Sequence, residues 1–150
     1  MNPVVKKVLK IVLELVVYAV IFVGVLYGLP KALSHYLKTP YPMAAITSGS
    51  MWPALSQGDL VLIRGEQSKE TIAEGDVVVW RGADGKGFVI HRVVKLNETT
   101  FITKGDANFT EDTPVKYEQL VGKALVTKSG KLIHVPYLGT ITTFASKRLQ

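Results

Sequence analysis

The sequence contains no cysteine, and this absence excludes several kinds of site at once. Thiol nucleophiles, disulfide bonds and thiolate metal ligands all require cysteine. Histidine is also scarce, with 3 in 150 residues. A catalytic site in this chain must therefore use oxygen or nitrogen nucleophiles, and we expect neither a metal nor a cofactor.

The sequence also lacks a dense basic run. Its formal net charge is +6, but the lysines and arginines are spread along the chain. Proteins that bind nucleic acid concentrate their basic residues on one face or in one run. We therefore expect no nucleic-acid partner, and an anionic membrane surface explains the charge as well.

The longest apolar run lies near the N-terminus, from Ile11 to Leu29, and only Glu14 interrupts it. At 1.5 Å per residue, a helix of this length comes close to the roughly 30 Å thickness of the hydrocarbon core of a bilayer. The alternative is a cleaved signal peptide, but the run is too long and no small-residue cleavage pattern follows it directly. The sequence therefore predicts one transmembrane helix that anchors the chain in the lipid bilayer.

Lysines on either side of this run indicate its orientation. Those that precede it slightly outnumber those that follow it closely: Lys6, Lys7 and Lys10 against Lys31 and Lys38. Since positive charge favours the cytoplasmic side, the N-terminus is expected in the cytosol. The remainder of the chain would then form a single-pass protein with its main domain on the extracytosolic side.

After residue 40 the pattern changes to short β-rich segments separated by turns. Gly58-Asp59 and Gly75-Asp76 are two such turns, each opening an apolar segment and requiring no chemistry. The strands are expected at residues 43–46, 59–64, 76–81, 87–95, 99–104, 120–128 and 131–135. This spacing is typical of a compact antiparallel barrel or sandwich, so the fold class is mainly β, following one N-terminal transmembrane helix.

The expected organisation has four parts. An N-terminal segment with the transmembrane helix covers residues 1–30, and a juxtamembrane linker rich in proline covers 31–42. The β-rich domain covers 43–139, and a short C-terminal tail, too polar to span a membrane, covers 140–150. At this length the chain supports one domain beside its anchor.

The segment from Thr47 to Pro53 places two serines around one glycine, and further polar residues follow it in the domain. A serine becomes a nucleophile when a base lies within hydrogen-bond reach and a carboxylate orients that base. His91 is the one histidine between this segment and a later polar loop that carries Asp106, Glu111 and Asp112. Each part alone has a structural explanation, but Ser, His and Asp in this order predict a serine hydrolase.

Three segments together resemble the successive motifs of type I signal peptidases: Ser48-Gly49-Ser50-Met51-Trp52-Pro53, His91-Arg92-Val93-Val94 and Lys104-Gly105-Asp106-Ala107-Asn108. Bacterial members carry a lysine where this chain has a histidine. The histidine is similar to the archaeal and endoplasmic-reticulum branch, which uses Ser-His-Asp. The resemblance extends to about Tyr137, beyond which many relatives have a second apolar segment that this chain lacks.

The resemblance implies roles for five residues. Ser50 would be the nucleophile, and the Ser48 hydroxyl would help to bind the oxyanion. His91 would act as general base and then as general acid. Asp112 would complete the triad with Asp106 in support, although the reverse assignment of the two aspartates stays open.

The resemblance also implies the function: a membrane-bound serine endopeptidase, signal peptidase I, that removes N-terminal signal peptides from exported preproteins. The substrate would lie extended between residues 43–46 and 87–90, as an added strand. Its partners would be signal-peptide-bearing preproteins and the lipid bilayer, and companion membrane subunits are compatible with it. Of the two membranes in which this branch occurs, we expect the archaeal cell membrane rather than the endoplasmic reticulum.

Two other functions fit parts of the sequence. A membrane-anchored β-domain that binds or scaffolds exported proteins without catalysis is compatible with the composition, but it has no need of Ser50, His91 and Asp112 together. A self-cleaving protein of the repressor type would require a lysine near position 91, and the nearest lysines lie outside the matched segment. Cleavage of a preprotein distinguishes the peptidase from the scaffold.

Overall fold

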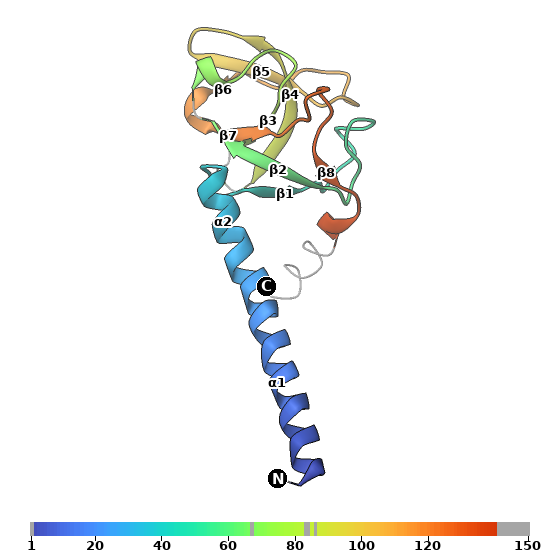
Figure 1. Cartoon of the computed structure of the whole chain (residues 1–150). Helices are drawn as coiled ribbons and strands as arrows, with labels where there is room; N and C mark the ends of the chain where they lie inside the picture. Colours follow the sequence, from blue (N-terminus) through green and yellow to red (C-terminus); the bar gives the residue numbers. More distant parts are fainter. Residues whose placement is uncertain (1, 67, 83–84, 86, 141–150) are drawn as a thin grey trace. The chain divides into compact units, whose positions relative to one another are not determined.

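The computed structural model describes residues 2–66, 68–82, 85 and 87–140. The chain forms two compact units, Met1–Tyr36 and Leu37–Gln150. The first unit is helical and the second contains the strands (Figure 1). Of the predicted C-terminal tail, residues 141–150 lie outside the described residues.

The first unit is one helical run in three parts: α1 (Pro3–Val23), the π-helical turn η1 (Gly24–Gly28) and α2 (Leu29–Tyr36). Asn2 caps its start, because the side-chain oxygen accepts a hydrogen bond of 3.0 Å from the Val4 N–H. Pro3 occupies the first helical turn, where its missing N–H leaves no bond unmade. The sequence thus starts the helix eight residues before the predicted apolar run.

The helix also continues past Pro30, where the sequence predicts a linker. A proline removes one backbone donor and crowds the preceding turn, which normally ends or kinks a helix. Here a π-helical turn comes directly before it, in which the Leu29 N–H donates to the Gly24 carbonyl. The different hydrogen-bond spacing of this turn accommodates the proline, and the helical part of the predicted linker extends to Tyr36.

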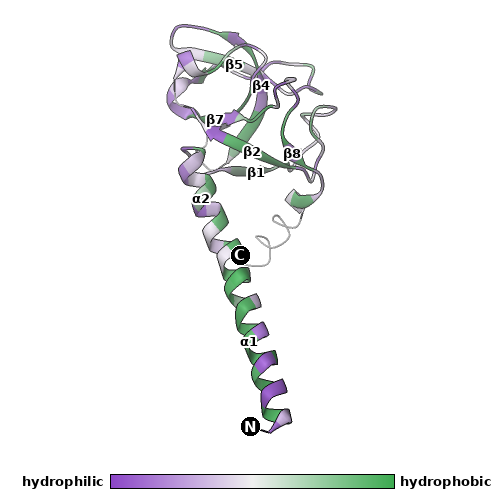
Figure 2. Ribbon diagram, in the orientation of Figure 1, coloured by the Kyte–Doolittle hydropathy of each residue, from purple (hydrophilic) through white to green (hydrophobic). Residues whose placement is uncertain are grey.

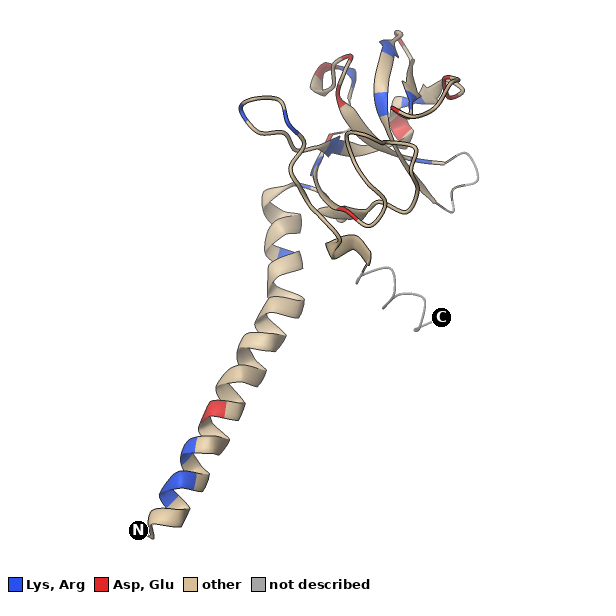
Figure 3. Cartoon of the chain, turned by 90° about the vertical axis from the view of Figure 1, so that its right-hand side faces the viewer, with Lys and Arg blue, Asp and Glu red and all other residues tan. Residues whose placement is uncertain are grey.

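None of the described residues of α1 is buried, and its apolar side chains are exposed along its length (Figure 2). In the described part of the chain, one helix, Pro3–Tyr36, is long and apolar enough to cross a membrane. Its charges gather toward the N-terminal end, where Lys10 Nζ lies 3.9 Å from Glu14 Oε1 (Figure 3). An exposed apolar helix of this kind requires an apolar surrounding such as lipid.

The second unit is built on one antiparallel sheet that curls on itself (Figure 1). Its strands are β1 (Met43–Ala45), β2 (Leu60–Gly65), β3 (Val77–Arg81), β4 (Phe88–Leu96), β5 (Thr100–Lys104), β6 (Val115–Lys116), β7 (Leu120–Ala124) and β8 (His134–Val135). The strand order is β1-β2-β7-β3-β4-β5-β6, with β8 also paired to β2. The predicted fold class, mainly β and antiparallel after one N-terminal helix, is confirmed.

Each predicted strand segment contains an observed strand, and the two Gly-Asp turns lie where the sequence predicts them. Gly58 and Gly75 have φ of +96° and +92°, a left-handed conformation that favours glycine. The sequence did not predict β6, whose two residues are too few for a recognisable alternation, nor the 3-10 turns η2 (Lys69–Thr71) and η3 (Tyr117–Gln119).

Two clusters of buried side chains form the core of the second unit. One cluster consists of Ile72, Val78, Trp80, Val93, Phe101, Val115 and Leu120. The other consists of Ile46, Met51, Leu55, Val61, Val77 and Ala124. The second cluster contains three residues from the segment around Ser50, so the core fixes that segment directly.

Candidate active site

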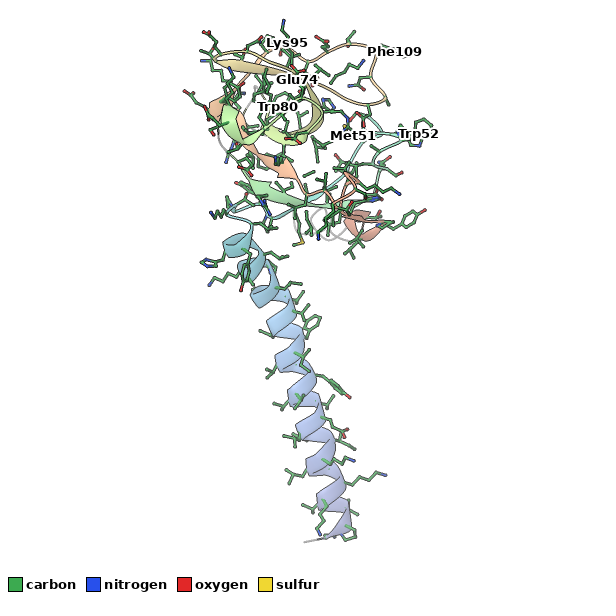
Figure 4. All side chains as sticks on the ribbon, turned by 45° about the horizontal axis from the view of Figure 1, so that its top comes forward. Met51, Trp52, Glu74, Trp80, Lys95 and Phe109 are labelled. Carbon is green, nitrogen blue, oxygen red and sulfur yellow. The ribbon has the colours of Figure 1, made fainter. Side chains whose placement is uncertain are left out.

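Ser50 lies in the turn between β1 and β2, beside two residues that anchor this turn in the core. Met51 and Leu55 are 0% and 1% exposed, whereas the neighbouring Trp52 is 63% exposed and projects outward (Figure 4). Backbone hydrogen bonds tighten the turn: the Trp52 N–H donates to the Gly49 carbonyl at 3.1 Å, and the Leu55 N–H donates to the Met51 carbonyl at 2.9 Å. The Ser50 side chain is thereby held on a rigid support.

His91 lies in β4 on the face that points into the domain, and its residue is 8% exposed. Its Nε2 lies 3.1 Å from Ser50 Oγ, and its Nδ1 lies 2.6 Å from Asp112 Oδ2. With a carboxylate at Nδ1, the neutral ring carries its proton there and presents the Nε2 lone pair to the serine. The structure therefore brings Ser50, His91 and Asp112 into one hydrogen-bonded line.

The other two histidines belong to other elements and are not members of this line. His35 is in α2. His134 is in β8, and its Nδ1 lies 2.9 Å from Asp59 Oδ2, without the geometry of a hydrogen bond. Asp59 is the aspartate of the first Gly-Asp turn, and it also accepts a hydrogen bond of 3.0 Å from the Ser56 N–H. This bond gives Asp59 a structural role in its turn.

Asp112 lies in the loop after β5, and Thr103 holds it by two hydrogen bonds. The Asp112 N–H donates to the Thr103 carbonyl at 2.8 Å, and Thr103 Oγ1 donates to Asp112 Oδ2 at 2.6 Å. Thr103 is fully buried, and the sequence analysis assigned it no role. A signal for it exists, because it alternates with the buried Phe101 along β5, and a buried hydroxyl requires a partner.

Ser48 lies next to the nucleophile, with its Oγ 3.1 Å from Ser50 Oγ. The residue is exposed, unlike His91 on the other side of the nucleophile. Its hydroxyl can therefore rotate toward a group that enters from the open side, such as a carbonyl oxygen under attack. This position suits the predicted role as an oxyanion donor.

Asp106 does not join the line through His91. Its two carboxylate oxygens accept hydrogen bonds from Arg92, at 2.8 Å from Nε and 2.7 Å from Nη2. Arg92 Nη1 in turn donates to the Gly75 carbonyl at 2.8 Å. The hydrogen bonds to Asp106 raise the pKa of the Arg92 guanidinium above its ordinary value, so the guanidinium stays charged. No role was predicted for Arg92 itself.

The loop that carries Asp106 also contacts the backbone of the nucleophile. The Ala107 N–H donates to the Ser50 carbonyl at 2.8 Å. A Cβ on Gly105 would lie 2.7 Å from that same carbonyl oxygen and 2.8 Å from Asn108 Nδ2, which is closer than real side chains come. This loop can therefore support Ser50 only with glycine at position 105.

A groove of about 330 Å³ leads to Ser50. The segments that line it are those between which the sequence predicts the substrate. Its lining residues are Ala44, Ala45, Ile46, Thr47, Ser48, Ser50, Val79, Phe88, Val89, Ile90, His91 and Asn108. β1 stands at the end of the strand order, so among the described residues one of its edges has no strand partner and can pair with an extended chain. A separate pocket of about 480 Å³ lies beside Arg92 and His134, and no member of the line through His91 borders it.

Comparison with known proteins identifies the family of this chain. No protein-family model matches it. Three fungal proteins, each named signal peptidase complex catalytic subunit SEC11, are similar over 78% of this chain. Identity is 33% for Zygosaccharomyces rouxii, with 73% of that protein covered, 30% for Metarhizium acridum and 29% for Fusarium vanettenii, with 71% of each covered.

The chain belongs to the type I signal peptidase family. It falls in the branch of these eukaryotic catalytic subunits, as the histidine at position 91 predicts. Membership makes the chain a peptidase, and the apolar helix Pro3–Tyr36 makes it a single-pass membrane protein within its described residues. The relatives compared are fungal, so they give no support to the archaeal cell membrane that the sequence favoured.

Proposed function

We propose that this chain is the catalytic subunit of a membrane-bound signal peptidase, a serine endopeptidase that removes N-terminal signal peptides from exported preproteins. The observation that carries the proposal is the line of hydrogen bonds from Ser50 through His91 to Asp112, in a member of this family. The names of the relatives, catalytic subunits of a signal peptidase complex, support both the substrate class and the presence of companion subunits.

The first half of the reaction transfers the signal peptide to Ser50. Its Oγ attacks the carbonyl carbon of the scissile bond while His91 Nε2 takes the hydroxyl proton, and Asp112 stabilises the resulting imidazolium through Nδ1–H. His91 then donates that proton to the leaving nitrogen, and the C–N bond breaks. The amine leaves as the new N-terminus of the mature protein, and the signal peptide remains as an ester on Ser50.

The second half releases the signal peptide. A water molecule gives one proton to His91 and attacks the ester carbonyl, and the Ser50 oxygen leaves with the proton that His91 returns. In both halves the tetrahedral intermediate carries a negative oxygen. We assign its hydrogen-bond donors to the Ser48 hydroxyl, whose Oγ lies 3.1 Å from Ser50 Oγ, and to the Ser50 backbone N–H. Such donors act most strongly on the charge that develops in the transition state.

Substrate selection follows from the groove. An extended signal-peptide end fits as an added strand between β1 and the start of β4, with alternate side chains directed into the groove. Signal peptides carry small residues next to their cleavage sites. We therefore assign small residues to the first and third positions before the cut.

The anchor places this site where its substrates emerge. The lysines in the first turns of α1, before the apolar run, favour a cytosolic N-terminus, which puts the β domain on the extracytosolic side. A preprotein threaded across the membrane presents its signal peptide within the same bilayer. Tethering both molecules to one membrane raises their effective concentration.

Product mapping tests the proposal against the scaffold alternative. The full chain, prepared with its companion subunits, is incubated with a preprotein, and the new N-terminus is identified by mass spectrometry. We expect one cut after a small residue, and replacement of that residue by phenylalanine should abolish the cut. Binding of intact preprotein without any cleavage would contradict the proposal and favour the scaffold.

A further inference from the structure

Thr103 lies beside the site because of the pairing of β4 with β5. In this antiparallel pair Thr103 is opposite Val93, and residues directly opposite each other share a face of the sheet. His91 lies two residues from Val93 along β4 and therefore on that same face. The sheet thus brings the threonine hydroxyl to the side on which the imidazole lies.

The contacts of this hydroxyl are specific. Thr103 Oγ1 lies 2.6 Å from Asp112 Oδ2, the same oxygen that accepts from His91 Nδ1 at 2.6 Å. Two donors thus converge on one carboxylate oxygen. The Asp112 side chain is 22% exposed and belongs to a loop, so it has room to turn toward solvent. Thr103 is 0% exposed, and a side chain packed on all sides has one available position.

From this geometry we propose that Thr103 is a positioning residue for the reaction, an inference that rests on the proposed function. Its hydroxyl holds the Asp112 carboxylate in line with His91, so that the imidazole keeps its tautomer and its direction toward Ser50. Thr103 itself touches neither the substrate nor the reacting atoms. The bond from its hydroxyl to a charged carboxylate belongs to the stronger class of protein hydrogen bonds.

The alternative is that Thr103 serves only packing, since β-branched residues suit strands. Two substitutions separate the alternatives. Thr103→Val keeps the shape and removes the hydroxyl, whereas Thr103→Ser keeps the hydroxyl and removes a methyl group. A matched control is Thr100→Val in the same strand, because the Thr100 hydroxyl bonds Asn97 and not the site.

The experiment measures kcat and KM for preprotein cleavage by the full chain with its companion subunits. Thr103→Val should lower kcat roughly 10- to 100-fold, the range expected for a hydrogen bond to a charged group, with KM changed less than about twofold. Thr103→Ser should retain most of the activity, and Thr100→Val should match the wild type. A Thr103→Val enzyme with wild-type kcat, or a Thr103→Ser enzyme as impaired as Thr103→Val, would overturn the inference.

A double-mutant comparison keeps the test valid if Thr103→Val also loosens the fold. If the threonine acts through the aspartate, adding Thr103→Val to Asp112→Ala should cost less than about twofold more in kcat. A full additional loss in the double variant would indicate a packing role and overturn the inference. If the wild type cleaves the preprotein in the same experiment, the proposed function is supported, whatever the effect of Thr103→Val. If the wild type does not cleave it, both the proposed function and the inference on Thr103 are contradicted.

Discussion

Asp106 and Asp112 lie in one loop yet contact different side chains. Asp112 accepts from His91 and Thr103, whereas Asp106 accepts two hydrogen bonds from Arg92. The first contact orients the base that must move a proton, and the second fixes the loop to β4. We therefore expect the two carboxylates to differ in what their loss does to the rate.

Replacing each aspartate by asparagine tests this difference. Asp112→Asn should lower kcat roughly 10³- to 10⁴-fold, because an amide at this position favours the wrong tautomer of His91. Asp106→Asn should lower it less than about tenfold, since the amide oxygen still accepts one bond from Arg92. Cleavage rates of the two variants on one preprotein measure this. The opposite ranking would make Asp106 the member of the triad.

Thr103 and Arg92 bond the two aspartates, and the sequence predicted neither contact. Ser50, His91 and Asp112 were found because their types and order resemble a known family. Nothing in the types of Thr103 or Arg92 distinguishes them from other strand residues. Their partners are set by the register of β4 against β5 and by the course of the following loop, which residue order does not specify.

At the scale of the elements, the loop of residues 105–108 packs closely against the backbone of the nucleophile. It donates the Ala107 N–H to the Ser50 carbonyl and leaves no room for a side chain at Gly105. This loop therefore couples the position of the nucleophile to the end of β5. A small change in the loop should affect catalysis before it affects the fold.

Gly105→Ala tests this coupling. The added Cβ must displace the Ser50 carbonyl or the Asn108 amide, so we expect kcat to fall at least about 100-fold, as misplacement by about 1 Å can cause. Gly130→Ala is the control for a general loss of stability, because its φ of +80° strains any side chain, a Cβ there meets nothing within 4 Å, and Gly130 does not line the groove. Thermal unfolding of both variants is measured beside activity. Normal activity of Gly105→Ala would contradict the assigned fit.

Among the elements, the strands agreed best with the prediction from the sequence, and the C-terminal end of the helix agreed least. Apolar β-branched segments such as Val77–Arg81 identify strands because their pattern reports burial directly. Pro30 indicated a break that the structure does not have, because the preceding π-helical turn depends on backbone hydrogen bonds rather than on residue type. The sequence did not predict β6, because its pairing with β5 depends on the course of the loop between them, residues 105–114.

At the scale of the whole molecule, the two units have different roles: the β domain carries Ser50, His91 and Asp112, and the helix anchors the chain in the membrane. The core clusters of the β domain consist entirely of residues after Tyr36, so this domain has the means to fold without the helix. The helix contributes none of the residues in the line through His91. Its contribution is to hold the site at the membrane.

Removal of residues 1–36 should therefore separate folding from function. We expect the remaining domain to unfold cooperatively and to cleave a soluble signal-peptide analogue, but to lose roughly 100-fold or more in rate on a preprotein embedded in liposomes. The measurement compares the loss of cleavage rate on the two substrates, because a general loss of activity would lower both rates by the same factor. Equal losses on both substrates would mean that the helix supports the fold rather than the encounter.

The central claim is that Ser50 is the nucleophile. The most direct measurement is the rate of preprotein cleavage by Ser50→Ala beside Ser48→Ala, two identical changes two residues apart, with thermal unfolding to confirm that both fold. Ser50→Ala should show no cleavage above background, while Ser48→Ala should lose less than the roughly 3 to 4 kcal/mol that a sole oxyanion donor supplies, because the Ser50 N–H remains. Cleavage by Ser50→Ala at the wild-type rate would contradict the central claim.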